Sequence, residues 1–381
     1  MKRLLIAAVV LAAAGAGQAQ SVDDLNVQVH GYVTQGFIYT THNNWNTTES
    51  TDGSPAWNDA VLNITAQPNA KLHIGVQGRY SLLGDEGNQI TLDWAQLDYK
   101  VNDYFGVRAG KVKSPLGLYN ETQDIDPAQL WILLPQSVYP LASRNALLAH
   151  YGGVVYGSLR LGQHMGKLQY RVFGGERVLA PDDGYFQQLR DAGLTVPNGI
   201  SGETAGGSVR WETPVRGLMF GASEHSGSPS GAVTAGPFSG MVTVPSFRQV
   251  FYFGKYEKGR VTLASEFSRL QTEVDVRLTG LPISYIRADQ HEYYVMGSYK
   301  ATSKLSGGLY FGSIVDHRAA YTSSRYEKDW ALSGRFDFNS FVYAKVEQHW
   351  IDGTSIGFSM SDNTHLQPTT KMTLLKMGVS F

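Results

Sequence analysis

The amino-acid sequence predicts an all-β fold: a transmembrane antiparallel β-barrel of about 16 strands, with a long third loop folded into the lumen. Segments with apolar residues at every second position recur from Val27 to Phe381, and short and long connections alternate between them. The longest connection, residues 113–151, has no period-2 pattern. Strands with one face in lipid need apolar residues only at alternate positions. A connection of that length is uncommon unless it has a function of its own.

Residues 1–19 are predicted to be a signal peptide, which leaves residues 20–381 for the barrel. Lys2 and Arg3 form a basic start, Leu4–Ala14 an apolar core, and Gly17-Gln18-Ala19 a cleavage site of the small-x-small type. The apolar run is short for a membrane span, and no stop-transfer pattern follows it. We therefore expect an exported protein.

Composition limits the classes to which the mature chain can belong. It has no cysteine, so a closed hydrogen-bonded sheet must hold it together in place of disulfides. Without Lys2 and Arg3 it carries 30 basic and 33 acidic residues, a net charge of −3, which excludes a basic nucleic-acid-binding chain. No long apolar run follows the signal peptide, so transmembrane helices are excluded as well.

The strands follow from alternation and turn signals. In the first, Val29, Val33 and Phe37 share one face, while His30 and Thr34 lie on the other. The same pattern gives strands at residues 27–39, 57–66, 71–83, 89–101, 104–112, 153–162, 167–176, 204–213, 217–226, 247–257, 259–269, 290–300, 304–314, 326–338, 341–350 and 371–381.

The connections separate into two kinds. They are short at 102–103, 163–166, 213–216, 257–259, 301–303 and 339–340, and long at 113–151, 177–203, 227–246, 270–289, 315–325 and 351–370. Short turns at one end and long loops at the other are typical of outer-membrane barrels, and an even strand number places both termini at the periplasmic end.

Three segments carry a resemblance to a known family. The opening GYVTQGF, the segment LDWAQLDYKVNDYFGVRAGKVKSPLGLYNE and a last strand ending at Phe381 resemble Gram-negative outer-membrane porins. The R-x-G-K-x-K-x-P-x-G stretch, Arg108–Gly117, is similar to the porin O/P and related trimeric families. The resemblance implies a homotrimer in outer-membrane lipid, and an assembly signal at Phe381 for the barrel-assembly machinery.

Charged residues opposite the apolar faces are expected to line the pore. Eleven are basic: Arg79, Lys100, Arg108, Arg160, Arg171, Arg210, Lys255, Lys300, Arg335, Lys345 and Lys376. Eight are acidic: Asp98, Glu212, Glu257, Glu266, Glu292, Asp329, Asp337 and Glu347. The difference of +3 predicts a weak preference for anions. Alternatively, these residues only solvate the wall and pair across strands.

The long loop is expected to narrow the lumen. It begins at Lys113, and its acids Glu121, Asp124 and Asp126 are expected to face Arg79, Arg108 and Arg160 across the pore. Asp126-Pro127 predicts the start of a short helix over Pro127–Leu134. The apolar run Leu130–Leu134 is expected to pack on the barrel wall or at a subunit contact.

The expected function is passive diffusion of small hydrophilic solutes and ions. A channel specific for an anion or dicarboxylate, and an outer-membrane barrel hydrolase, remain alternatives. The sequence contains neither a G-x-S-x-G elbow nor an H-E-x-x-H zinc motif, and we expect no enzymatic activity, cofactor or metal.

Overall fold

The computed structural model describes residues 25–381 except 47, 85–88 and 163, so the predicted signal peptide lies outside the described residues. Sixteen antiparallel strands form the wall: β1 (Gln28–Thr40), β2 (Ser54–Asn69), β3 (Leu72–Leu83), β4 (Gln89–Lys100), β5 (Gly106–Lys113), β6 (Ala149–Arg160), β7 (Lys167–Leu179), β8 (Ile200–Glu212), β9 (Leu218–Gly227), β11 (Phe238–Lys258), β12 (Val261–Leu278), β13 (Ser284–Lys300), β14 (Leu305–Asp316), β15 (Tyr326–Asp337), β16 (Val342–Gly353) and β17 (Thr369–Ser380). Each pairs with its neighbours in sequence order, and β17 pairs with β1. The predicted fold class is confirmed.

The remaining elements are short and lie in the long connections. They are β10 (Ser230–Ala235), η3 (Asp126–Ala128), η4 (Leu141–Ser143), α2 (Arg144–Leu148), η5 (Gly184–Phe186), α3 (Gln187–Asp191) and η6 (Ser323–Arg325). Among the residues that the structure describes, no helix is long and apolar enough to cross a membrane.

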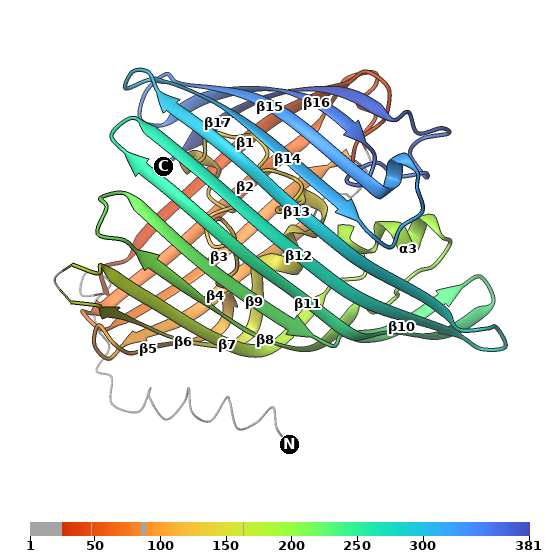
Figure 1. Cartoon of the computed structure of the whole chain (residues 1–381), viewed down its shortest axis with the longest axis horizontal. Helices are drawn as coiled ribbons and strands as arrows, with labels where there is room; N and C mark the ends of the chain where they lie inside the picture. Colours follow the sequence, from red (N-terminus) through yellow and green to blue (C-terminus); the bar gives the residue numbers. More distant parts are fainter. Residues whose placement is uncertain (1–24, 47, 85–88, 163) are drawn as a thin grey trace.

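The two ends of the barrel differ as expected. Tight turns such as the one between β11 and β12 lie at one end, and the long connections lie at the other (Figure 1). Two expected loops are largely strand, however. The β12–β13 ladder continues to Val276 paired with Ser284, and residues 230–243 form the β10–β11 hairpin. Backbone pairing continues there beyond the part of the strands with clear apolar alternation.

The apolar outer face is visible on β17. Leu375, Met377 and Val379 are about half exposed, while Leu374 and Lys376 are buried inside the barrel. Successive side chains of a strand point to opposite faces, so the outward residues form the surface that faces lipid. The inward residues pack against the segment that fills part of the lumen.

Barrel closure places the last residue against the first strand. The backbone of Phe381 exchanges two hydrogen bonds with Gly31, at 3.1 and 3.0 Å. A Cβ atom at Gly31 would lie 2.7 Å from the Phe381 ring, so glycine makes room for that ring. The terminal aromatic therefore caps the seam at which the barrel closes.

We expect deletion of Phe381 to lower the amount of folded barrel in the outer membrane several-fold, because it removes the last hydrogen-bonded pair of the closing seam. The shift in gel mobility between unboiled and boiled membrane samples measures the folded fraction. Phe381→Trp is the matched control and should insert nearly as well as the wild type. Normal levels of folded protein after the deletion would contradict an assembly role.

Candidate functional site

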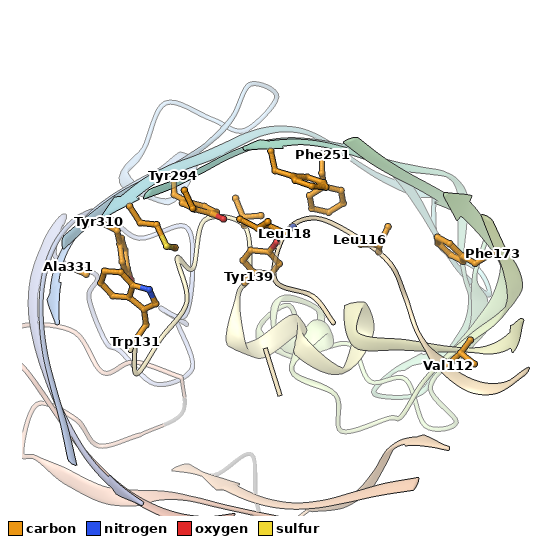
Figure 2. Packing of buried hydrophobic residues seen from close by; sticks show 14 of the residues in the cluster. Val112, Leu116, Leu118, Trp131, Tyr139, Phe173, Phe251, Tyr294, Tyr310 and Ala331 are labelled. Carbon is orange, nitrogen blue, oxygen red and sulfur yellow. Dashed lines mark hydrogen bonds between the residues drawn. The ribbon is translucent and has the colours of Figure 1, made fainter. Parts of the chain in front are cut away.

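The connection between β5 and β6 folds into the lumen, as the sequence predicts. Figure 2 shows Leu118, Trp131 and Tyr139 of this loop beside Tyr294, Tyr310 and Phe251 of the wall, and these side chains belong to one buried cluster. The rings of Trp131 and Tyr310 meet edge to face, with centroids 5.2 Å apart. A Cβ atom at Gly308 of β14 would lie 2.6 Å from the Trp131 ring, so a glycine in the wall admits the indole.

The apolar run Leu130–Leu134 packs on the inner wall, but the expected helix over Pro127–Leu134 is wrong. Only Asp126–Ala128 forms a turn of 3₁₀-helix. Beyond it, the backbone N–H groups of Ile132 and Leu133 both donate to the Glu347 carboxylate of β16, at 3.0 Å each. An acceptor on the wall thus takes the donors that a helix would have satisfied internally.

Glu121 is the loop acid that lies beside three arginines of the wall. Its carboxylate forms an ion pair with Arg171 of β7, and lies 3.5 Å from both Arg108 of β5 and Arg210 of β8. Arg108 also donates from Nε to Asp98 at 2.8 Å. These side chains keep about a fifth of their surface accessible, so the group borders open space inside the barrel. We call these five residues the Glu121 cluster.

Asp126 anchors the loop to the opposite part of the wall. Its carboxylate lies 3.0 Å from the Lys345 ammonium and 2.9 Å from that of Lys376, and it accepts a hydrogen bond from the Tyr343 hydroxyl at 2.7 Å. Burial alone would raise the pKa of this carboxyl, but Lys345 and Lys376 outweigh burial and hold the pKa below its usual range. The group is ionised at neutral pH and fixes the loop in place.

Asp124 is a second buried anchor. It pairs with Lys113 at 2.7 Å, accepts from Gln77 Nε2 at 2.8 Å and from Trp94 Nε1 at 3.3 Å. The Asp124 side chain is completely inaccessible. Its charge is therefore used between the loop and the wall rather than in the open lumen.

Several of the bases predicted to line the pore do not pair with the loop acids. Arg79 pairs with Asp59, Lys100 with Asp103 at the short-turn end, and Arg160 is exposed at that same end. The expectation that Arg160 faces the loop is wrong, whereas Arg79 borders Leu141 and Arg144 of the loop but pairs with Asp59 and not with a loop acid. The loop leaves β5 at Lys113, which pairs with Ala149, whereas Arg160 ends β6 at the far end of the ladder.

One loop–wall ion pair escapes sequence reasoning entirely. Arg144 of α2 donates to both oxygens of Asp93 in β4, at 3.0 and 2.7 Å, and both side chains are buried. Strict alternation would place Asp93 on the outer face, opposite to Asp98. The β3–β4 register shifts next to Gln77 and Gly78, so Asp93 and Trp94 are both buried. Such a bulge cannot be read from a period of two.

Arg335 is a further loop contact whose role the sequence does not reveal. Its Nη1 donates to the carbonyl oxygens of Pro127 and Gln129, at 2.6 and 2.8 Å.

Within the described part of the chain, no group of three or more His, Asp or Glu residues could hold a metal ion.

Comparison with known proteins gives matches in structure alone. No family model matches the chain. No curated protein matches it in sequence. The anion-selective porin from Comamonas acidovorans is 12% identical with a TM-score of 0.56, over 93% of this chain and 99% of that one. OmpF of Salmonella typhi, in complex with daunomycin, is 12% identical with a TM-score of 0.59, over 95% and 99%. OmpT, an outer-membrane protein of Vibrio cholerae, is 14% identical with a TM-score of 0.55, over 96% and 100%.

Each match spans nearly the whole of both chains at very low identity, so what is shared is the closed barrel and its strand order. The chain therefore has the fold of the outer-membrane porins.

Proposed function

We propose that the chain is a passive diffusion channel for small hydrophilic solutes and ions, with a weak preference for anions. The Glu121 cluster is the observation that supports this most directly. It sets three guanidinium groups, Arg108, Arg171 and Arg210, against the carboxylates of Glu121 and Asp98, an excess of one positive charge. A fixed excess charge in a lumen with low-dielectric walls biases which ions enter.

The buried anchors add little to this selectivity. Asp124 with Lys113, and Asp126 with Lys345 and Lys376, are almost inaccessible to solvent. Asp124 and Lys113 compensate each other, while Asp126 with its two lysines leaves one positive charge in excess; passing ions do not contact either group because both are covered. The Glu121 cluster, at the accessible surface of the loop, is thus the part of the site on which permeation should depend.

We expect the double variant Arg108→Gln, Arg171→Gln to shift the reversal potential in a salt gradient from weakly anion-selective to weakly cation-selective. The change removes two positive charges from the cluster and leaves Glu121 with Arg210 alone. Planar-bilayer recordings of the purified protein measure this directly. Higher ionic strength should reduce the difference, because salt screens charges in a water-filled lumen.

Arg160→Gln is the control for this experiment. It removes a positive charge from the exposed end of β6, away from the loop. Its reversal potential should stay close to that of the wild type. An unchanged potential in the double variant would show that the Glu121 cluster does not face the conducting path.

A channel specific for dicarboxylates is a second candidate, because three guanidinium groups within reach of one carboxylate can bind a dianion. A specific channel would show currents blocked at saturating concentrations of a dicarboxylate such as succinate, whereas a diffusion channel would show conductance proportional to salt.

A homotrimer is also part of the proposal, supported by the structural match to OmpT of Vibrio cholerae in its trimer form.

A hydrolase is the alternative of a different class. Ser114 Oγ lies 3.0 Å from His150 Nδ1, but both side chains are completely buried, and no carboxylate of the described residues hydrogen-bonds that ring. A substrate could not reach this serine without displacing the loop. Lipase and protease assays on the protein used for conductance would separate the two classes.

A further inference from the structure

A cavity lies inside the barrel on the side of the long connections, and no residue of the Glu121 cluster lines it. It has a volume of about 570 Å³. Its walls come from α2, from the connection that carries η5 and α3, from the inner faces of β11–β13, and from residues 355–359 between β16 and β17. Cavities of roughly 300–1,000 Å³ are of the size that holds drug-sized organic molecules.

The lining of this cavity is mostly apolar. Phe186, Val242, Val276, Ile314 and Phe358 contribute to it, from five separate elements or connections. A water-filled vestibule for ions would have little reason to present so much apolar surface. Such surface favours a ligand with an apolar body, because moving that body out of water is itself favourable.

Polar side chains also line the cavity, and one of them is a base without an acidic partner. Among the described residues around the cavity, Arg177 of β7 is the only lysine or arginine. Its Nη1 lies 3.4 Å from His225 Nδ1 of β9, while its Nε and Nη2 are buried and have no hydrogen-bond partner. No carboxylate of the described part of the chain forms an ion pair with this guanidinium, and a buried unpaired charge is costly.

His225 holds the guanidinium without neutralising it. Its other ring nitrogen, Nε2, lies 3.2 Å from Gln249 Oε1, and Gln249 Nε2 donates in turn to Glu292 at 3.1 Å. These partners assign the proton to Nε2, so that Nδ1 accepts from Arg177 and the imidazole is neutral. Arg177 is thus fixed in orientation through one nitrogen, while Nε and Nη2 remain without a hydrogen-bond partner.

The two unpartnered nitrogen atoms are those that bind carboxylates elsewhere in this chain. Arg269 contacts Asp289 through Nε and Nη2 at 2.9 Å each, and Arg248 contacts Glu224 through the same atoms at 3.2 and 2.8 Å. This side of a guanidinium forms two parallel hydrogen bonds to one carboxylate. Four carboxylates line the cavity: Asp191, Glu203, Glu292 and Asp362. Asp191 accepts a hydrogen bond from Ser359, and Glu292 accepts one from Gln249.

We propose that this cavity binds a monocarboxylate with an apolar body, its carboxylate held by Nε and Nη2 of Arg177 and its body packed among the apolar side chains. Both nitrogen atoms are covered in this structure, so binding requires the neighbouring side chains to move aside. The ligand enters from the side of the long connections and binds apart from the Glu121 cluster.

The test is titration calorimetry on the full barrel in lipid nanodiscs, with empty nanodiscs as the blank. The probe is 2-naphthoate, compared with neutral 2-naphthylmethanol and with acetate, which lacks the apolar body. We expect saturable naphthoate binding, weakened roughly tenfold to a hundredfold in Arg177→Gln, as the loss of a charge-assisted pair of hydrogen bonds implies. Arg177→Lys should bind with intermediate affinity, because it keeps the charge and loses the paired geometry.

Arg248→Gln is the matched control, since it removes an exposed arginine from β11 outside the cavity. It should bind naphthoate like the wild type. Equal affinity for naphthoate and naphthylmethanol on the wild type would overturn the proposal even if no Arg177 variant folds. Undetectable binding of naphthoate, binding of acetate with equal affinity, or unchanged binding in Arg177→Gln would overturn it as well.

Discussion

Deletion of residues 121–134 is expected to raise the single-channel conductance by roughly twofold or more, because a 16-stranded barrel freed of its inserted loop leaves a wide aqueous lumen. The deletion removes Glu121, Asp124 and Asp126 together with the apolar run Leu130–Leu134. Larger neutral solutes should also pass, which liposome-swelling rates with sugars of increasing size would measure. The barrel itself should persist, because its hydrogen-bonded wall closes without the loop.

A side-chain contact joins the two parts of the loop that flank this deletion. The Tyr139 hydroxyl, just after the deleted segment, accepts from the backbone N–H groups of Leu118 and Tyr119, just before it, at 2.9 Å each. The two ends therefore lie close together, and a short glycine linker connects them.

Deletion of residues 318–321 provides the control. This segment is largely exposed and lies between β14 and β15, outside the lumen. Its removal should leave conductance and solute size limit unchanged. If the variant lacking 121–134 inserts correctly and conducts like the wild type, the loop does not restrict the conducting path.

Asp126→Asn is expected to destabilise the folded protein by about 3–5 kcal/mol, as removing one partner of a buried ion pair does. Lys345 and Lys376 would remain buried next to a neutral amide, and the Lys345 side chain has no accessible surface. Urea unfolding of the protein in detergent, followed by tryptophan fluorescence, measures the change in unfolding free energy. The loop should also become more sensitive to protease.

The control for this variant is Asp103→Asn, which breaks an exposed pair with Lys100 at the short-turn end. Exposed pairs contribute little, so its stability should stay close to that of the wild type. Adding Lys376→Met to Asp126→Asn should recover part of the loss, because it removes one uncompensated charge. Equal effects of Asp126→Asn and Asp103→Asn would show that the buried pairs do not anchor the loop.

The effect of Asp126 should depend on pH in a defined direction. Because its folded-state pKa lies below the ordinary 3.8, the ionised carboxyl contributes its full stabilisation above that value. The contribution is lost as the pH falls through the folded-state pKa. The difference in stability between wild type and Asp126→Asn should thus be constant near neutral pH and shrink in strong acid.

The sequence by itself determined the barrel. Alternation along each strand, the separation of short from long connections and an unusually long segment at 113–151 follow from general constraints: lipid on one face, water on the other, and no unpaired strand edges. These constraints act locally and repeat around the wall, so each strand can be recognised independently. The sequence also predicts that the apolar run of the long loop needs another apolar surface, but it leaves open the barrel wall or a subunit contact, and the structure places the run on the wall.

Tertiary structure alone decided which charges meet. The alternation of side chains places Arg108, Arg160 and Arg171 on the inner face but does not give their positions along the barrel axis. That position alone separates Arg160 from the loop. A bulge turns Asp93 inward to meet Arg144. Glu347 accepts hydrogen bonds from the backbone N–H groups of Ile132 and Leu133, which the expected helix would have used internally. In the sequence, Arg177 is one more basic residue at the start of a predicted connection. Its guanidinium has no acidic partner because it is held by His225 of β9, which is held in turn through Gln249 of β11 and Glu292 of β13. Each of these contacts joins residues far apart in the chain, and no local pattern encodes them.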